Sequence, residues 1–285
     1  EKPRLKVEKE SSSSSPWMCG RARAATAAEV REAAADIARG GRRTESRQAP
    51  GGQGTTTTPP SSGAVVEASS VLAVVEAEEE LASFEASANA SPGRKLGVVT
   101  TNDESKVAAR AVSWGLGENR WRLFNARSET AHQLHSFRKL YAKKNGGRCV
   151  AVLRGFYEWT DGALKQKQPH YAARDDGGLL YVAGLCDDDG CTLLTRDVVP
   201  SLAWLHDRMP IIFPDGRAAR DWLAFDGAQG RFAFPEPPPL KTYPVHPKMS
   251  KLTYQEDGAN QPLKPPKKVT DFFKPSSSSS SLRGS

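Results

Sequence analysis

The second half of the chain contains short apolar runs, each bounded by polar or turn-forming residues. These runs occupy residues 149–153, 179–186, 191–194 and 211–213, and their lengths are typical of buried β-strands. Apolar residues at helical spacing predict helices at residues 127–144 and 217–225. Because strands and helices do not alternate regularly, we expect an α+β domain with mainly antiparallel strands and a few helices.

The N-terminal part combines one well-marked helix with a segment of low complexity. Thr26 and Glu29 have the spacing of a capping box, and Gly40 is a suitable stop, so residues 26–40 predict a helix. Residues 41–63 are rich in Gly, Thr, Ser and Pro, a composition that cannot form a core. We therefore expect a flexible insertion directly after this helix.

Both ends of the chain are polar, and we expect both to be disordered. Residues 1–17 include five consecutive serines, and we interpret them as a disordered segment or as sequence upstream of a start at Met18. Residues 264–285 form a basic tail rich in Pro, Lys and Ser. A single domain is then expected over residues 18–263.

Composition argues against several classes of protein. No apolar run approaches the roughly 20 residues that span a bilayer, and the first residues lack the apolar stretch of a signal peptide. We expect neither a membrane partner nor secretion, while an organellar address stays open. The cysteines form no CxxC pair and have no histidine at metal-ligand spacing, so we expect no metal site and no cofactor. Cys149, Cys186 and Cys191 lie in apolar runs and are expected to be buried free thiols.

The net charge of +7 is unevenly distributed. Residues 241–285 hold eight basic and three acidic side chains, which leaves the rest of the chain nearly neutral. Binding of nucleic acid would therefore depend on local clusters of arginine and not on bulk charge.

Four short blocks place a chemically capable residue beside Gly, Trp, Arg or Pro. They are Met-Cys-Gly-Arg at 18–21, Asn-Ala-Arg-Ser-Glu-Thr at 125–130, Gly-Phe-Tyr-Glu-Trp at 155–159 and His-Asp-Arg-Met-Pro at 206–210. Glu158 directly follows an apolar strand and lies between two aromatic residues, which is an environment that suits a carboxyl group for proton transfer.

In order and spacing these blocks resemble the motifs of the SRAP (SOS response-associated peptidase) family. The resemblance implies a DNA-repair enzyme that recognises abasic sites in single-stranded DNA. It also implies that Cys19, exposed after removal of Met18 and any preceding residues, forms a covalent thiazolidine crosslink with the DNA. By the same carry-over, Asn125 orients the amine or the sugar, Glu158 shuttles protons, and His206 acts as acid or base on the sugar hydroxyl.

The resemblance also suggests which residues contact DNA. Arg21, Arg127 and Arg208 belong to three of the four blocks, and arginine binds phosphate through two parallel hydrogen bonds. Trp114 and Trp159 are expected to stack on bases or to wedge against a duplex end, although positions in the core would suit both rings equally. In a eukaryote, we expect such a protein in the nucleus.

Two other functions remain open at this stage. Cys19 and His206 could serve a cysteine peptidase, whose substrate would include the segment that precedes Cys19. The chain could also be a non-catalytic reader of single-stranded or modified DNA.

The basic tail contains a further motif. Val269, Phe272 and Phe273 would lie on one face of a single helical turn, as in the short motif by which repair proteins dock on the sliding clamp. The position that usually holds glutamine in that motif is Pro266. A sliding clamp is therefore a second expected partner, beside single-stranded DNA.

Overall fold

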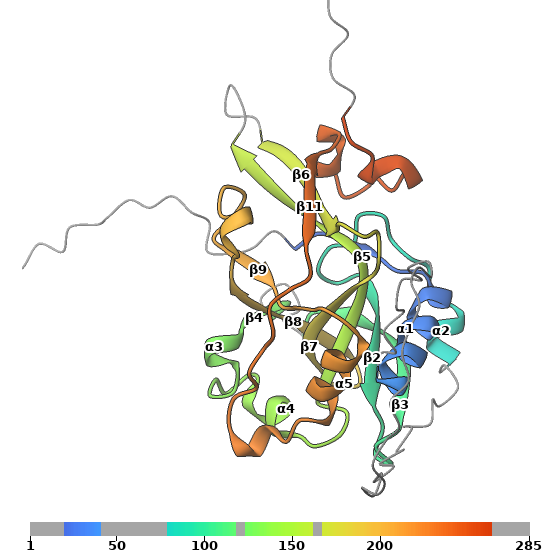
Figure 1. Cartoon of the computed structure of the whole chain (residues 1–285). Helices are drawn as coiled ribbons and strands as arrows, with labels where there is room; N and C mark the ends of the chain where they lie inside the picture. Colours follow the sequence, from blue (N-terminus) through green and yellow to red (C-terminus); the bar gives the residue numbers. More distant parts are fainter. Residues whose placement is uncertain (1–19, 41–78, 118–122, 162–166, 264–285) are drawn as a thin grey trace, which may run out of the picture.

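The computed structural model of the chain describes residues 20–40, 79–117, 123–161 and 167–263 (Figure 1). Cys19, the expected insertion at 41–63 and the tail with its clamp motif lie outside these residues, so the expectations for them stay predictions.

The described residues form one sheet of eleven strands. The strands are β1 (Ala22–Ala24), β2 (Lys95–Thr101), β3 (Val107–Trp114), β4 (Asn125–Arg127), β5 (Arg148–Asp161), β6 (Lys167–Arg174), β7 (Leu180–Cys186), β8 (Gly190–Asp197), β9 (Arg208–Pro210), β10 (Ile212–Phe213) and β11 (Leu240–Pro244). Strands β7, β8, β3, β2 and β5 pair in that order, and β5 pairs back with β7, so these five close into a ring. All pairs are antiparallel except β3–β8 and β4–β8. The expected α+β class with mainly antiparallel strands is confirmed.

Helix α1 (Ala27–Arg39) covers one wall of the ring. The capping box of Thr26 and Glu29 is present in full, and Gly40 ends the helix with φ 71°. Its buried face packs on β2 where Gly97 lies, since a Cβ on Gly97 would come within 2.3 Å of a methyl carbon of Val30. Figure 1 shows α5 (Gly216–Ala224) beside α1, and the helix expected at 217–225 is thereby confirmed.

The prediction of one continuous helix at residues 127–144 is wrong. Two short helices, α3 (Ser128–Ala131) and α4 (Arg138–Ala142), are separated by turns. The reason is packing: Phe137 and Tyr141 are buried, whereas Leu134 stays 47 % exposed. The apolar spacing that suggested a continuous helix therefore does not correspond to one buried face.

The remaining short helices lie in the connections. They are α2 (Glu79–Ala82) and the 3-10 helices η2 (Pro200–Leu202), η3 (Gly227–Gln229), η4 (Pro247–Ser250) and η5 (Asp257–Asn260). None of the helices in the described part of the chain is long and apolar enough to cross a membrane.

The main core fills the ring and the space under α1 and α5. It holds the three thiols of Cys149, Cys186 and Cys191, all buried and free, as expected. Arg148 is also buried, and its guanidinium donates to the backbone oxygens of Tyr141, Lys143, Lys144 and Trp222. This guanidinium therefore ties α4 and α5 to the start of β5.

A second, smaller apolar cluster lies where β5 and β6 extend beyond the ring. It consists of Ala88, Tyr157, Tyr171, Ala173, Val245, Met249 and Ala259. The cluster packs the C-terminal segment of the domain against one face of the β5–β6 pair.

Candidate active site

Gly20 marks where the first block enters the domain. It follows Cys19 in the chain, and a Cβ at this position would lie 2.8 Å from Pro92 Cγ and 2.9 Å from Phe124 Cε2. Only glycine allows the backbone to approach these two rings so closely. The next residue, Arg21, accepts a hydrogen bond from the backbone N–H of Tyr157 at 3.0 Å. The first block is therefore held between the strand of Glu158 and the segment that precedes Asn125.

Glu158 lies near the end of β5, beyond the ring, and is 1 % exposed. Directly opposite it on β6 is His170, which is also buried. Because residues paired across antiparallel strands point to the same face, the side chains of Glu158 and His170 lie on one face of the β5–β6 pair. Burial lowers the pKa of His170 below its ordinary value, although the nearby Gln168 carbonyl opposes this shift.

Asn125 begins β4, where it pairs with Leu193 of β8. The preceding residue, Phe124, holds the backbone of Asn125 in place. Its carbonyl oxygen accepts hydrogen bonds from Trp114 Nε1 and from the backbone N–H of Leu193, each at 2.9 Å. The side-chain amide is different: both its oxygen and its nitrogen are buried and make no hydrogen bond within the described residues. A buried amide without a hydrogen bond lowers the free energy of unfolding by about 1–3 kcal/mol. A ligand that forms hydrogen bonds with this amide would remove that cost.

Asn125 does not cap the helix that follows it, although asparagine is a favoured N-cap residue. The residue at the N-cap of α3 is Arg127, and no side chain caps this helix.

His206 lies in the connection between η2 and β9. Its Nδ1 accepts from the backbone N–H of Arg208 at 3.0 Å and lies 2.7 Å from Asp207 Oδ1. A neutral ring satisfies the first contact, with its proton on Nε2, while a charged ring can donate from Nδ1 to the carboxylate. His206 therefore has a partner in both protonation states, as an acid–base group requires.

Arg208 is bound by the protein itself. Its guanidinium makes a two-point contact with Glu129, at 3.0 and 2.9 Å, and also contacts Asp197 and the Thr195 carbonyl oxygen. Partial burial would raise the pKa of Glu129, but the hydrogen bonds and charge of Arg208 outweigh this and lower it. The contact joins the segment of His206 to the block that contains Asn125. Arg127, in contrast, is exposed at the start of α3.

Trp114 does not occupy a DNA-facing position. Its ring is 2 % exposed, and it packs edge-to-face with Phe124 at a centroid distance of 6.0 Å. The expectation that Trp114 stacks on bases is therefore wrong, because a ring this deep in the core cannot reach a base. Sequence alone did not separate the two roles, since both require an aromatic side chain after an apolar strand.

Arg21 and Trp159 lie together, on the face of β5 opposite to Glu158. Side chains of adjacent strand residues point to opposite faces, and Trp159 packs with the second cluster. The Arg21 guanidinium lies 5.6 Å from the Trp159 ring centroid and donates to Asn89 Oδ1. Trp159 Nε1 donates to Ser250 Oγ at 3.0 Å. In this structure both side chains fasten the C-terminal segment to β5.

The comparison with sequence families decides the classification of the chain. A model of the family described as "SOS response associated peptidase (SRAP)" matches residues 18–252. The chain belongs to the SRAP family. The match spans all four blocks, together with the elements that hold them.

Named relatives of this SRAP chain are abasic site processing proteins. It is 31 % identical over 159 residues to YMR114C of Saccharomyces cerevisiae, covering 50 % of this chain and 41 % of that protein. It is 29 % identical over 182 residues to HMCES of Xenopus tropicalis, covering 51 % and 53 %. The matches thus span about half the length of these relatives.

A solved structure supports the SRAP fold. A protein of Bacteroides thetaiotaomicron, 19 % identical, superposes with a TM-score of 0.53 over 65 % of this chain and 88 % of that one. At this identity the likeness concerns the fold alone.

Two residues near the SRAP blocks could not be recognised from the sequence as neighbours of the candidate site. His170 is opposite Glu158 only through the pairing of β5 with β6. Trp204, which precedes His206 by two residues, is 56 % exposed and packs edge-to-face on His170. Their proximity arises from strand register, which a linear pattern of motifs does not contain.

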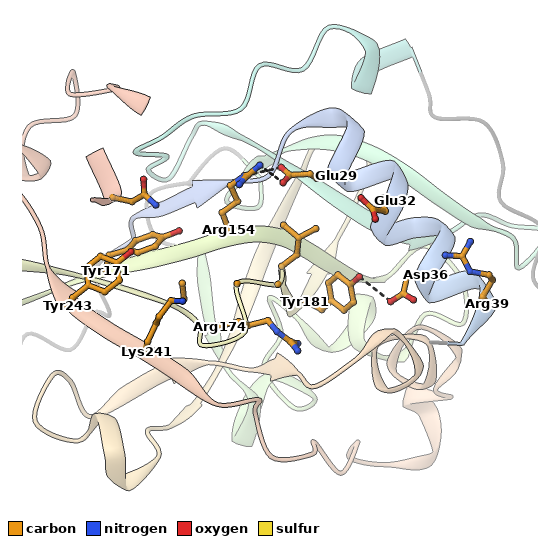
Figure 2. A pocket seen from close by; sticks show the side chains of 15 residues that line it. Glu29, Glu32, Asp36, Arg39, Arg154, Tyr171, Arg174, Tyr181, Lys241 and Tyr243 are labelled. Atoms are coloured by element: carbon orange, nitrogen blue, oxygen red, sulfur yellow. Dashed lines mark hydrogen bonds and ion pairs between the residues drawn. The ribbon is translucent and has the colours of Figure 1, made fainter. Parts of the chain in front are cut away.

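A separate cleft of about 490 Å³ lies between α1 and the β6–β7 turn (Figure 2). None of the expected catalytic residues lines it. Two of its acidic side chains have partners within the lining: Glu29 pairs with Arg154, and Tyr181 donates to Asp36. Burial and the Asp36 carboxylate together raise the pKa of Tyr181.

Proposed function

We propose that this SRAP domain recognises abasic sites in single-stranded DNA and binds them covalently through the amine and thiol of Cys19. The printed names of its relatives, which describe abasic site processing proteins, support this substrate. The observation that carries the proposal is the position of the first block: Gly20 packs on Phe124, which precedes Asn125, and Arg21 bonds to Tyr157, which precedes Glu158. Beside it, the amide of Asn125 is buried and without a hydrogen bond among the described residues.

The proposed chemistry requires Cys19 to bear a free α-amine. An abasic site is partly a ring-opened aldehyde. The amine adds to the aldehyde carbon, and loss of water gives an imine. The thiol sulfur then adds to the imine carbon, and its proton passes to the nitrogen, which closes a thiazolidine ring. The net change is the loss of one water molecule, and only an N-terminal cysteine supplies both nucleophiles.

The buried groups have distinct proposed roles in these steps. Glu158 carries the proton that must reach the departing water, which suits a carboxyl group excluded from solvent. Asn125 uses its buried amide to orient the amine or the sugar hydroxyl. His206 serves as acid or base on the sugar, since its two partners support both protonation states.

For DNA binding, we propose that the exposed Arg127, which belongs to the same block as Asn125, binds a phosphate of the strand. Arg208 contributes mainly through its contact with Glu129, which keeps the His206 segment beside that block. A phosphate would have to compete with this carboxylate for the Arg208 guanidinium.

A crosslinking assay tests the proposal. Three proteins are incubated with a single-stranded oligonucleotide that carries one abasic site: a chain that begins at Cys19, the same chain with Cys19→Ser, and the 285-residue chain. Only the first is expected to give an adduct that withstands denaturing electrophoresis without chemical reduction. A stable adduct with Cys19→Ser, or with residues 1–18 still attached, would contradict the thiazolidine mechanism. Cleavage of peptides without any adduct would favour a peptidase.

A further inference from the structure

Trp204 is the most exposed of the large apolar side chains among the described residues, at 56 %. It lies in the turn between η2 and His206, and Leu202, two residues before it, and Leu205, directly after it, are buried. The backbone that carries the ring is therefore anchored on both sides. An isolated exposed apolar residue is common and carries no inference by itself, so the surroundings of the ring decide.

The ring has a fixed support on its inner side. It packs edge-to-face on His170, with ring centroids 5.1 Å apart and an interplanar angle of 81°. His170 is itself buried, and its Nδ1 lies 3.1 Å from the Gln168 carbonyl oxygen. Trp204 therefore connects the segment of His206 with β6, at the residue that is paired with Glu158 of β5.

An abasic residue offers no base for recognition. A protein that selects it from single-stranded DNA must draw binding free energy from phosphates and from the neighbouring bases. Aromatic side chains stack on any base and strengthen binding by about 5- to 150-fold per base. The two tryptophans that the motifs indicated are poorly placed for this, since Trp114 is in the core and Trp159 is held by Arg21 and Ser250.

We propose that Trp204 is the stacking platform for a nucleobase next to the abasic residue, so that the site favours strands in which this base is intact. The proposal rests on the proposed function and adds a specificity-determining residue to it. The occupant is an unpaired base of the bound strand, because the ring lies on His170, the residue paired with Glu158, and precedes His206 by two residues, while most of its surface is open to solvent.

The test uses binding without covalent capture. In the Cys19→Ser background, fluorescence anisotropy measures the Kd for single-stranded oligonucleotides with one tetrahydrofuran abasic analogue. One oligonucleotide has intact bases on both sides, and a second has the analogue at those positions too. Trp204→Ala should weaken binding to the first by about 5- to 150-fold and to the second by less than about 2-fold. Trp204→Phe should retain most of the affinity, and Leu252→Ala, which removes another exposed apolar side chain, should change neither Kd.

Each result has a separate meaning. Equal weakening on both oligonucleotides would overturn the proposal, because the ring would then act on the backbone or on the fold. Unchanged binding in Trp204→Ala would also overturn it, and would favour a protein partner for the exposed ring. If the Cys19→Ser parent bound neither oligonucleotide, the proposed function itself would fail. Loss of binding to the first oligonucleotide alone supports both the platform and the function.

Discussion

Gly20→Ala probes how tightly the first block is held beside the proposed nucleophile. The new methyl group would lie 2.8 Å from Pro92 Cγ, 2.9 Å from Pro92 Cδ and 2.9 Å from Phe124 Cε2. Pro92 is a rigid ring, and both neighbours are buried, so neither can rotate away. The backbone at residue 20 must move instead.

The size of the movement follows from the contacts. Ordinary van der Waals contact begins near 3.4 Å, so the closest pair must separate by at least 0.6 Å. Overpacking of this kind costs about 1–3 kcal/mol of unfolding free energy. For a domain of this size, each kcal/mol lowers Tm by about 2–4 °C, so we expect a fall of about 2–12 °C.

The effect on the reaction should be larger than the effect on stability suggests. A misplacement of 1 Å at a reacting group costs about 100-fold in rate, so a shift of more than half that size should cost roughly 10-fold or more. The rate of adduct formation is measured under single-turnover conditions with the chain that begins at Cys19. Thermal unfolding is followed on the same samples.

A matched glycine provides the control. Gly258 has only Gln261 Cγ, at 3.8 Å, near the position of an added Cβ, so Gly258→Ala should leave rate and Tm unchanged. If Gly20→Ala reacted at the parental rate, the packing around Gly20 would not position the nucleophile, and this reasoning would be refuted.

Four further variants test other contacts. Arg208→Ala should lower the unfolding free energy by about 1.5–3 kcal/mol, because the Glu129 carboxylate loses its two-point partner; an unchanged urea midpoint would contradict this. Arg127→Ala should instead leave stability intact while lowering the salt slope of DNA binding by about 1, and a loss that depends on base sequence would count against a phosphate contact. Burial lowers the pKa of His170, so the unfolded chain takes up this proton first as pH falls below about 6.5. The resulting loss of stability between pH 6.5 and 5, followed by urea unfolding, should be smaller in His170→Phe; equal losses would show that His170 does not contribute. Arg148→Met should cost about 3 kcal/mol or more, since four backbone oxygens lose their donor, and a Tm near that of the parent would refute this.

Four of the eleven described strands could be predicted, because each contains a short apolar run bounded by polar or turn-forming residues. Residues 149–153 and 179–186 fall in β5 and β7, as expected. The closure of the ring could not be predicted, because the pairing of β5 with β7 and with β2 depends on contacts between distant segments. The helix expected at 127–144 failed because apolar spacing does not reveal which residues a turn will leave in solvent.

The candidate site likewise has features that the sequence predicts and features that depend on the tertiary structure. The resemblance of the four blocks to the family motifs selected Asn125, Glu158 and His206 as candidates, because each block is continuous in the chain. The edge-to-face contact of Trp204 with His170 and the pairing of Arg208 with Glu129 depend on strand register and on side-chain direction. These are tertiary properties, and a pattern of motifs does not specify them.

The central claim is that Cys19 forms a thiazolidine with an abasic site, and intact mass spectrometry tests it most directly. The chain that begins at Cys19 is reacted with an abasic oligonucleotide, and the adduct is weighed, digested and mapped. We predict a mass equal to the sum of both reactants less one water, with the modification on the peptide that begins at Cys19 and no free thiol on that residue. An adduct on a lysine, or one that leaves the Cys19 thiol free to alkylation, would contradict the account.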